Sequence, residues 1–178
     1  MQDMLVLIEP VIPALRRYAR ALLHNSTAAD DLVQDSLERA ISAWGQRRAD
    51  GDVKSWLFTI LHNLAMNSFT QARRRGEHIS LEEADPSAFA RDAPQENGLR
   101  HRELVNALAQ LPDDQRSVIL LVSVEGLSYA QTAKVLAVPV GTVMSRLSRG
   151  RERLATLLKA DSGGQAAHRS APHLRRVI

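Results

Sequence analysis

The sequence contains no cysteine, and only 4% of its 178 residues are aromatic. The lack of cysteine excludes disulfides, thiolate zinc sites and a cysteine nucleophile. Hydrophobic residues still make up 44% of the chain and are mostly Leu, Val, Ile and Ala, which is enough to bury real cores. Because these residues recur with helical periods and few aromatics accompany them, the composition favours helices over sheets.

Signals for membranes and for catalysis are also missing. No uninterrupted apolar run approaches the roughly 20 residues that span a bilayer. The first residues include Asp3 and Glu9, which do not fit the basic-then-apolar layout of a signal peptide. We therefore expect a soluble, cytoplasmic protein. The six histidines show no metal-binding spacing, and no Gly-rich phosphate loop or Gly-x-Ser-x-Gly turn occurs, so we expect no metal, no cofactor and no enzyme activity.

The net charge of +3 is unevenly distributed along the chain. Residues 76–98 hold one basic and six acidic residues, a balance of −5, whereas residues 99–160 hold nine basic and five acidic residues, a balance of +4. Residues 1–75 are mildly basic, with ten basic and eight acidic side chains. A basic block is typical of a protein that binds a polyanion, although +4 is a weak footprint by itself.

Apolar spacing predicts three helices in the first 75 residues. One apolar face runs from Leu5 to Leu22, a second helix capped by Ser26 or Thr27 runs to Trp44, and a third follows the polar loop 45–52. Three amphipathic helices of this length predict one compact bundle over residues 1–76.

Periodicity collapses between residues 77 and 98, where Pro86 and Pro94 lie among scattered acidic residues. This stretch predicts a flexible acidic linker with a short helical piece near Ser87–Ala90. A second helical domain is expected over residues 99–160, and residues 161–178 are expected to form a disordered tail. The predicted fold is therefore all-α, with two small helical domains joined by a linker.

The second domain carries the strongest local signal. Pro112 ends one predicted helix, and Ser128-Tyr129-Ala130-Gln131 is a capping box that starts another, running to about Leu136. After a turn over residues 137–139, a last helix is expected to run to about Leu158. Two helices joined by a tight turn, with the small Ala133 where they cross, predict a helix-turn-helix whose second helix enters a major groove. A basic, solvated helix of an ordinary bundle is the alternative.

Two further predicted helices have a polar or charged face that suggests a function. The third helix is polar along one side and ends in three arginines, with Trp56 and Phe58 near its start, so it fits a surface for single-stranded DNA. The alternative is that both aromatics are core residues and the arginines merely favour a helix C-terminus. The second helix presents an acidic face, and this face suits either a basic partner or water.

Several motifs, in this order and spacing, resemble the extracytoplasmic-function (ECF) group of the sigma-70 family. The region 4 motifs are Leu111-Pro112-x-x-Gln115-Arg116, Gly126-Leu127-Ser128-Tyr129 and Gly141-Thr142-Val143-x-Ser145-Arg146-Leu147-x-Arg149-x-Arg151. The region 2 motifs are Asp30-Asp31-Leu32-Val33-Gln34-Asp35 and Ser55-Trp56-Leu57-x-x-Ile60-x-x-Asn63-x-Ala65. The likeness spans residues 5–158.

The resemblance implies a protein that joins core RNA polymerase, reads the −35 promoter element as duplex and captures unpaired bases of the −10 element. It assigns core-polymerase binding to Asp30, Asp31, Leu32, Gln34, Asp35 and Glu38. It assigns −10 DNA binding to Arg47, Arg48, Lys54, Trp56, Asn63, Asn67, Arg73 and Arg74. It assigns −35 DNA binding to Thr142, Met144, Ser145, Arg146, Ser148, Arg149, Arg151 and Arg153. It also implies control by a separate anti-sigma factor, which we expect to be membrane-anchored.

The chain departs from the family pattern at several positions of region 4. Ala137 replaces a common Gly at the turn, Met144 replaces a common basic residue, and Ser148 and Gly150 are smaller than usual. A stand-alone helix-turn-helix regulator is the main rival, but it would need a dimerisation or ligand domain that residues 1–75 do not resemble. A protein-binding helical adaptor is a second rival, and the arginine-laden last helix argues against it.

Overall fold

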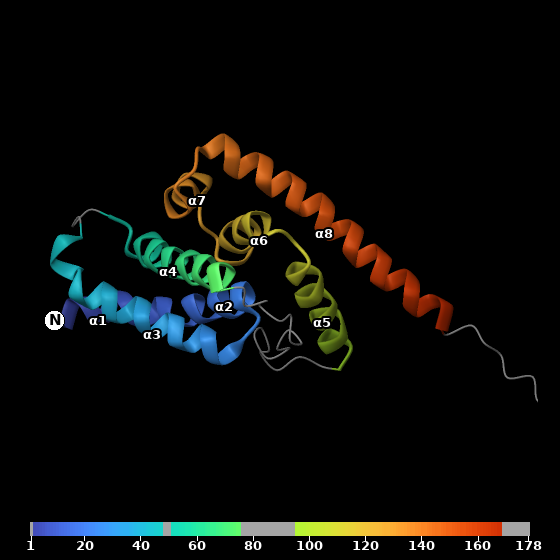
Figure 1. The fold of residues 1–178 in the computed structure, drawn as a ribbon, viewed down its shortest axis with the longest axis horizontal. Helices are drawn as coiled ribbons and strands as arrows, with labels where there is room; N and C mark the ends of the chain where they lie inside the picture. Colours follow the sequence, from blue (N-terminus) through green and yellow to red (C-terminus); the bar gives the residue numbers. More distant parts are fainter. Residues whose placement is uncertain (1, 48–50, 76–94, 169–178) are drawn as a thin grey trace, which may run out of the picture.

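The computed structural model describes residues 2–47, 51–75 and 95–168, and every regular element in these ranges is helical (Figure 1). The N-terminal domain comprises α1 (Gln2–Ile8), the 3₁₀ turn η1 (Glu9–Val11), α2 (Ile12–Leu23), α3 (Ser26–Ser42), the 3₁₀ turn η2 (Trp44–Gln46) and α4 (Val53–Arg75). The C-terminal domain comprises α5 (Gln95–Ala109), α6 (Asp113–Ile119), the π-helical segment η4 (Leu120–Val124), α7 (Tyr129–Leu136) and α8 (Val140–His168). The all-α class is confirmed. The predicted linker lies outside the described residues up to 94, and its last residues belong to α5.

The single helix expected over Leu5–Leu22 is wrong, because the structure divides this stretch into α1, η1 and α2. Pro10 and Pro13 lie in the first turns of η1 and α2. Proline has no N–H to donate and is tolerated only at the start of a helix, so each proline begins a new helical segment. The apolar face survives this division, and Ile8, Leu15 and Leu22 are all buried.

The cap of α3 also differs from the expectation. The Asn25 side chain, not Ser26 or Thr27, accepts a hydrogen bond from the Ala28 backbone N–H at 2.9 Å. Asn25 has extended backbone angles, which suit an N-cap residue. The preceding His24 ends α2 in the left-handed region with a φ of 55°.

The helix-turn-helix forms as predicted. Ser128 and Gln131 make the reciprocal capping box of α7, Ala133 is buried, and α7 ends at Ala137 before α8 begins. Ala137 has a φ of 52°, a left-handed conformation in which glycine avoids the steric cost of a Cβ. α8 continues to His168, whereas the last helix was expected to end near Leu158 and the tail to begin at residue 161. Residues 169–178 lie outside the described ranges.

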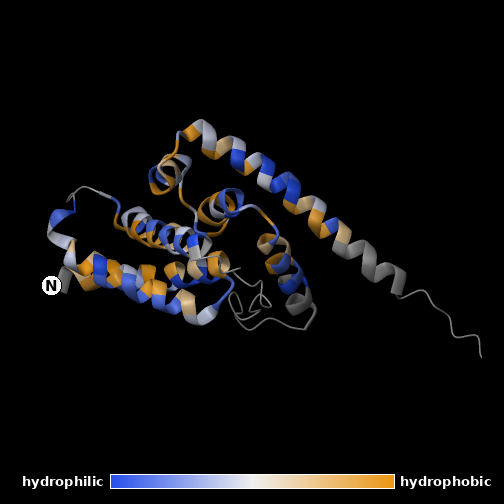
Figure 2. Cartoon of the chain, in the orientation of Figure 1, coloured by the Kyte–Doolittle hydropathy of each residue, from blue (hydrophilic) through white to orange (hydrophobic). Residues whose placement is uncertain are grey.

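The two domains pack against each other. α7 of the C-terminal domain lies along α4, and α2 contacts α5, α6 and η4 (Figure 1). A single cluster of buried apolar side chains runs through both domains, from Leu15 and Phe58 to Leu121 and Val143. The exposed middle of α8 is strongly hydrophilic (Figure 2). None of the helices within the described residues is long and apolar enough to cross a membrane.

Candidate nucleic-acid and protein interfaces

The acidic face predicted on the second helix is present on α3. Asp30, Asp31, Gln34, Asp35 and Glu38 are all exposed. Leu32, which the resemblance placed in the same interface, is buried in the core with 8% of its surface exposed. Because α3 must bury one stripe against its neighbours, Leu32 serves the fold and only the polar residues are available to a partner.

Neighbouring side chains organise this acidic face. Arg20 from α2 donates to the Asp30 carboxylate at 3.1 and 3.3 Å, which ties one end of the face to its own domain. The Gln34 side-chain amide donates to Glu38 at 3.0 Å, one turn along α3. Asp31 and Asp35 lie one turn apart on the same side of α3. Two like charges at this spacing repel slightly, so a cationic partner would stabilise them.

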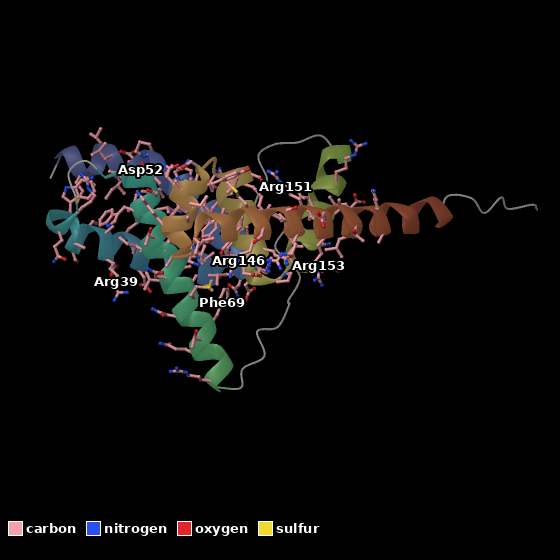
Figure 3. The ribbon with its side chains drawn as sticks, turned by 90° about the horizontal axis from the view of Figure 1, so that it is seen from above. Arg39, Asp52, Phe69, Arg146, Arg151 and Arg153 are labelled. Atoms are coloured by element: carbon pink, nitrogen blue, oxygen red, sulfur yellow. The ribbon has the colours of Figure 1, made fainter. Side chains whose placement is uncertain are left out.

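A depression of about 460 Å³ lies next to this face. Its lining residues come from the second half of α3 and from α4, and they are Asp35, Glu38, Arg39, Ser42 and Leu64. Figure 3 labels Arg39 at this position. The acidic face is therefore accompanied by a hollow that side chains of a partner can enter.

The N-terminal end of α4 is built around Asp52. Its carboxylate accepts hydrogen bonds from the backbone N–H groups of Lys54 and Ser55 at 3.2 and 3.1 Å, so Asp52 caps the helix. The Gln131 side chain also donates to it, at 2.7 Å. Burial by itself would raise the pKa of Asp52, but the hydrogen bonds from Ser55, Lys54 and Gln131 lower the pKa below its usual value.

An aromatic and cationic cluster lies beside this cap. The rings of Trp44 and Trp56 meet edge to face, with centroids 5.9 Å apart. The Arg47 guanidinium lies 4.7 Å from the Trp44 ring centroid and donates to the Gly51 carbonyl at 3.0 Å. Stacked aromatic and arginine groups are the chemistry that holds unpaired bases. Trp44 was expected only as the end of the second helix, and its place in this cluster was not predicted.

The other −10 candidates that the structure describes on α4 differ in how exposed they are. Asn63, Asn67 and Arg74 are exposed, whereas Arg48 and the side chain of Arg73 lie outside the described residues. Phe58 is fully buried, which confirms the core interpretation for that residue, and Trp56 is half-buried.

His62 belongs to the interior of the molecule. Its Nδ1 atom and the Tyr18 hydroxyl lie 2.9 Å apart in a buried hydrogen bond. Burial lowers the pKa of His62 to about 4. Burial raises the pKa of the Tyr18 phenol above its usual value, and a hydrogen bond with the Ser117 side chain of α6 partly offsets this shift.

Four of the residues that the resemblance assigned to −35 DNA binding are exposed on the first half of α8. Ser145, Ser148 and Arg149 are exposed, and Met144 is 50% exposed. The Arg149 Nε atom donates to the Ser145 carbonyl at 3.3 Å, so its guanidinium lies along the helix surface. Their spacing of three and four residues places these polar groups together on the outer side of the recognition helix.

The remaining arginines of α8 lie on two different sides of the helix. Arg146 forms an ion pair with Asp114 at 3.1 Å, and Arg151 donates to the Ser123 hydroxyl at 3.3 Å. Arg153 is exposed on the same side as Arg146, whereas Arg151 lies on the other (Figure 3). Arg146, which the resemblance assigned to −35 DNA binding, therefore takes part in an ion pair within its own domain. Thr142 is half-buried at the start of the helix.

Gly150 lies on the inner side of α8, so its small size serves packing. A Cβ added at Gly150 would lie 2.9 Å from Ile119 Cδ1 and 3.3 Å from Gln115 Cβ. Such distances are shorter than ordinary carbon contacts, and the absence of a side chain lets α8 approach α6 closely.

Sequence reasoning missed the contacts between the two domains. The Glu125 carboxylate accepts hydrogen bonds from Arg17 Nε and Nη2 at 2.8 and 2.6 Å, across 108 positions of the sequence. The Glu125 carbonyl accepts a hydrogen bond from the Lys54 ammonium at 2.6 Å. The one available signal was an acidic residue inside the apolar stretch from Val118 to Leu127, which marks a buried charge without naming its partner.

An exposed acidic helix, an aromatic and cationic helix end, and a helix-turn-helix on one chain define a two-domain DNA-binding protein. Residues 8–62 match the family described as the Sigma2 domain of PhyR, and residues 101–154 match Sigma-70, region 4. The chain is 37% identical over 154 residues to the ECF RNA polymerase sigma factor EcfG of Rhodopseudomonas palustris, covering 84% of this chain and 82% of the relative. The protein belongs to the ECF group of the sigma-70 family.

Other comparisons agree with this assignment. The chain is 38% identical to the ECF RNA polymerase sigma factor SigM of Mycobacterium tuberculosis, over 81% of this chain and 71% of the relative. Its fold resembles the sigma factor RpoE of Bartonella quintana, solved with the anti-sigma factor NepR, with a TM-score of 0.73, 35% identity and coverage of 90% and 99% of the two chains. It also resembles CnrH, solved with the cytosolic domain of CnrY, with a TM-score of 0.61, 28% identity and coverage of 83% and 82%.

Proposed function

We propose that the protein binds core RNA polymerase, directs it to promoters through their −35 and −10 elements, and assists melting so that transcription starts. Family membership supports this function, and the exposed acidic face of α3 is the observation that carries it. A repressor or activator that acts alone on duplex DNA needs no such face, whereas a sigma factor must hold the enzyme that it directs.

Each interface has a distinct chemical task in this function. Asp31, Gln34, Asp35 and Glu38 offer carboxylates and an amide to a basic surface of the polymerase. The Trp44, Arg47 and Trp56 cluster, with Asn63 and Asn67 further along α4, offers stacking and amide groups to unpaired bases. Ser145, Ser148 and Arg149 offer hydrogen-bonding groups to base edges in the major groove.

Run-off transcription from a pool of randomised promoters tests this proposal. Purified core polymerase is incubated with the pool in the presence and absence of the protein, and the transcripts are sequenced. We expect the protein to enrich templates that share two separated elements. A stand-alone regulator would give no transcript above that of core enzyme alone, and this result would contradict the proposal.

We further propose that a separate anti-sigma factor holds the protein inactive. One solved neighbour, the sigma factor RpoE, is in complex with the anti-sigma factor NepR, and another, CnrH, is in complex with the cytosolic domain of CnrY. An amphipathic helix of the partner would cover the α3 face, the α8 face or both. Co-purification from the native host without polymerase should recover a stoichiometric partner, and fractionation of membranes tests the expected anchoring. Recovery of only free protein and holoenzyme would place control in synthesis or degradation instead.

A further inference from the structure

Glu125 is a buried carboxylate whose side chain is 1% exposed. Both hydrogen bonds that its side chain accepts within the described chain come from Arg17, on α2 of the other domain. A buried carboxylate without a cationic partner is strongly unfavourable, because it has lost its water. The burial of Glu125 in this closed arrangement therefore depends on Arg17.

Local backbone geometry aims Glu125 at the N-terminal domain. The π-helical segment η4 ends there, and the Glu125 N–H donates to the Leu120 carbonyl at 2.9 Å. Gly126 follows with a φ of 71°, a left-handed conformation that turns the chain toward α7. π-helical turns are rare and occur often at functional sites.

Two more contacts bring the same turn and α7 onto the end of α4. Lys54 donates to the Glu125 carbonyl at 2.6 Å, and Gln131 donates to the Asp52 carboxylate at 2.7 Å. Together, Arg17, Asp52 and Lys54 of the N-terminal domain and Glu125 and Gln131 of the C-terminal domain form what we call the interdomain latch. Figure 3 labels Asp52 at the end of α4.

The latch lies on the part of α4 to which the proposed function assigns binding of the −10 strand. Lys54 is one of the residues assigned to the −10 strand, and here its ammonium is engaged by Glu125. Asp52 caps α4 beside the Trp44, Arg47 and Trp56 cluster, and α7 packs along the same helix. In contrast, the base-reading groups of α8 and the acidic face of α3 remain exposed. The closed arrangement therefore obstructs the proposed −10 surface at Lys54, near the N-terminal end of α4.

We propose that the free protein is autoinhibited by this latch, and that the C-terminal domain must leave α4 before the −10 strand can bind. The inference rests on the proposed function. A buried ion pair contributes little net stability relative to its solvated ions, so it specifies the closed geometry without preventing opening. Removing one partner, however, strands the other in the interface and favours the open form.

Fluorescence energy transfer within the full chain tests the latch. Because the chain has no native cysteine, Ala28→Cys on α3 and Ala155→Cys on α8, both at exposed positions, provide two unique labelling sites. We expect Arg17→Gln or Glu125→Gln to raise the ratio of open to closed molecules about tenfold or more. The double variant should be less open than the two single effects combined, because neither charge is then left alone.

Arg16→Gln is the matched control. Arg16 lies on the same helix as Arg17, but its ion pair, at 3.9 Å, is with Asp30 of its own domain. This variant should keep the wild-type energy transfer. If Glu125→Gln does not fold, as judged by circular dichroism, the partly exposed Arg17→Gln decides the test. Unchanged transfer in Arg17→Gln, or a wild-type protein that is already open, would overturn the latch.

Two activity readouts separate this inference from the proposed function. Binding of a fluorescein-labelled, randomised single-stranded DNA by the free protein should tighten about tenfold in Glu125→Gln, in parallel with opening, and equal binding by wild type and the opened variant would overturn autoinhibition. Run-off transcription with core enzyme is measured on the same samples. If wild type gives transcripts and the latch variants do not change their amount, the latch alone is contradicted. If no sample gives transcripts, the proposed function is contradicted.

Discussion

At the scale of single residues, some arginines of this protein are buried and paired, whereas others are exposed. Arg116 is buried, and it donates to the Asp113 carboxylate at 2.6 Å and to the Ala109 carbonyl at 3.2 Å. Burial lowers the pKa of Arg116, an effect that Asp113 opposes. Arg149, by contrast, is exposed on α8, and within the described residues its one hydrogen bond is to the Ser145 carbonyl of its own helix. A guanidinium that is positioned but not paired suits direct readout of a base.

Replacing Arg149 with alanine should weaken binding to the −35 duplex by roughly 1–3 kcal/mol, provided that it makes a bidentate guanine contact. Fluorescence anisotropy with a duplex chosen from the randomised pool measures this loss. Arg153→Ala is the comparison, because a phosphate contact should weaken binding to specific and random DNA alike. An equal loss on both duplexes for Arg149→Ala would reassign it to the backbone.

The buried histidines make stability depend on pH. Burial lowers the pKa of both His24 and His62 from 6.5 to about 4. Between these values the unfolded chain binds protons that the folded chain does not, so stability is complete above pH 6.5 and falls as the pH drops toward 4. For His62 the loss at pH 5 is about 2 kcal/mol.

Urea unfolding at pH 7 and pH 5 measures this dependence. His62→Asn keeps a polar atom near Tyr18 but cannot titrate, so its stability should change less between the two pH values than that of wild type. The pH dependence of stability that remains in this variant comes from His24. A variant that loses as much stability as wild type would show that His62 is not the source.

At the scale of elements, local sequence signals account for most boundaries, and packing accounts for the rest. The capping box at Ser128 and the break after Asn25 could be read from sequence, because capping depends on nearby side chains. The division of the first helix could also have been read from Pro10 and Pro13, but the continuous apolar face outweighed them. The extension of α8 through Gly163 and Gly164 had no local signal, since both residues disfavour helix.

Ala137 offers a test of the helix-turn-helix turn itself. Its φ of 52° is strained for a residue with a Cβ. Ala137→Gly should therefore raise the free energy of unfolding by roughly 0.5–1 kcal/mol, after the greater freedom of glycine in the unfolded chain is allowed for. Urea denaturation measures it.

Ala155→Gly, within the exposed middle of α8, is the control for that substitution. There the helix favours alanine, so the same change should lower stability by about 1 kcal/mol. A loss in both variants would mean that the turn at Ala137 is not left-handed in solution.

At the scale of the whole molecule, the sequence could predict two helical regions and the exposed polar faces of α3 and α8, but not how the two regions pack together. The α3 face and the α8 face are surface patterns within single helices, so periodicity reveals them. The contact of Arg17 with Glu125 joins residues 108 positions apart, and nothing local specifies it. A protein interpreted as two domains on a linker is, in this structure, one packed body, and its interdomain contacts cover part of the surface that we propose for the −10 strand.

Holoenzyme assembly by a charge-reversed α3 tests the central claim most directly. Asp31→Lys with Asp35→Lys changes two exposed side chains, so the fold should survive while the electrostatic match to the polymerase is inverted. Size-exclusion chromatography with core enzyme should show a complex for wild type and for the control Glu9→Lys, which reverses an exposed charge on η1 of the same domain. The double variant should elute free. A double variant that folds and still binds core polymerase as wild type does would contradict the claim that this face makes the protein a sigma factor.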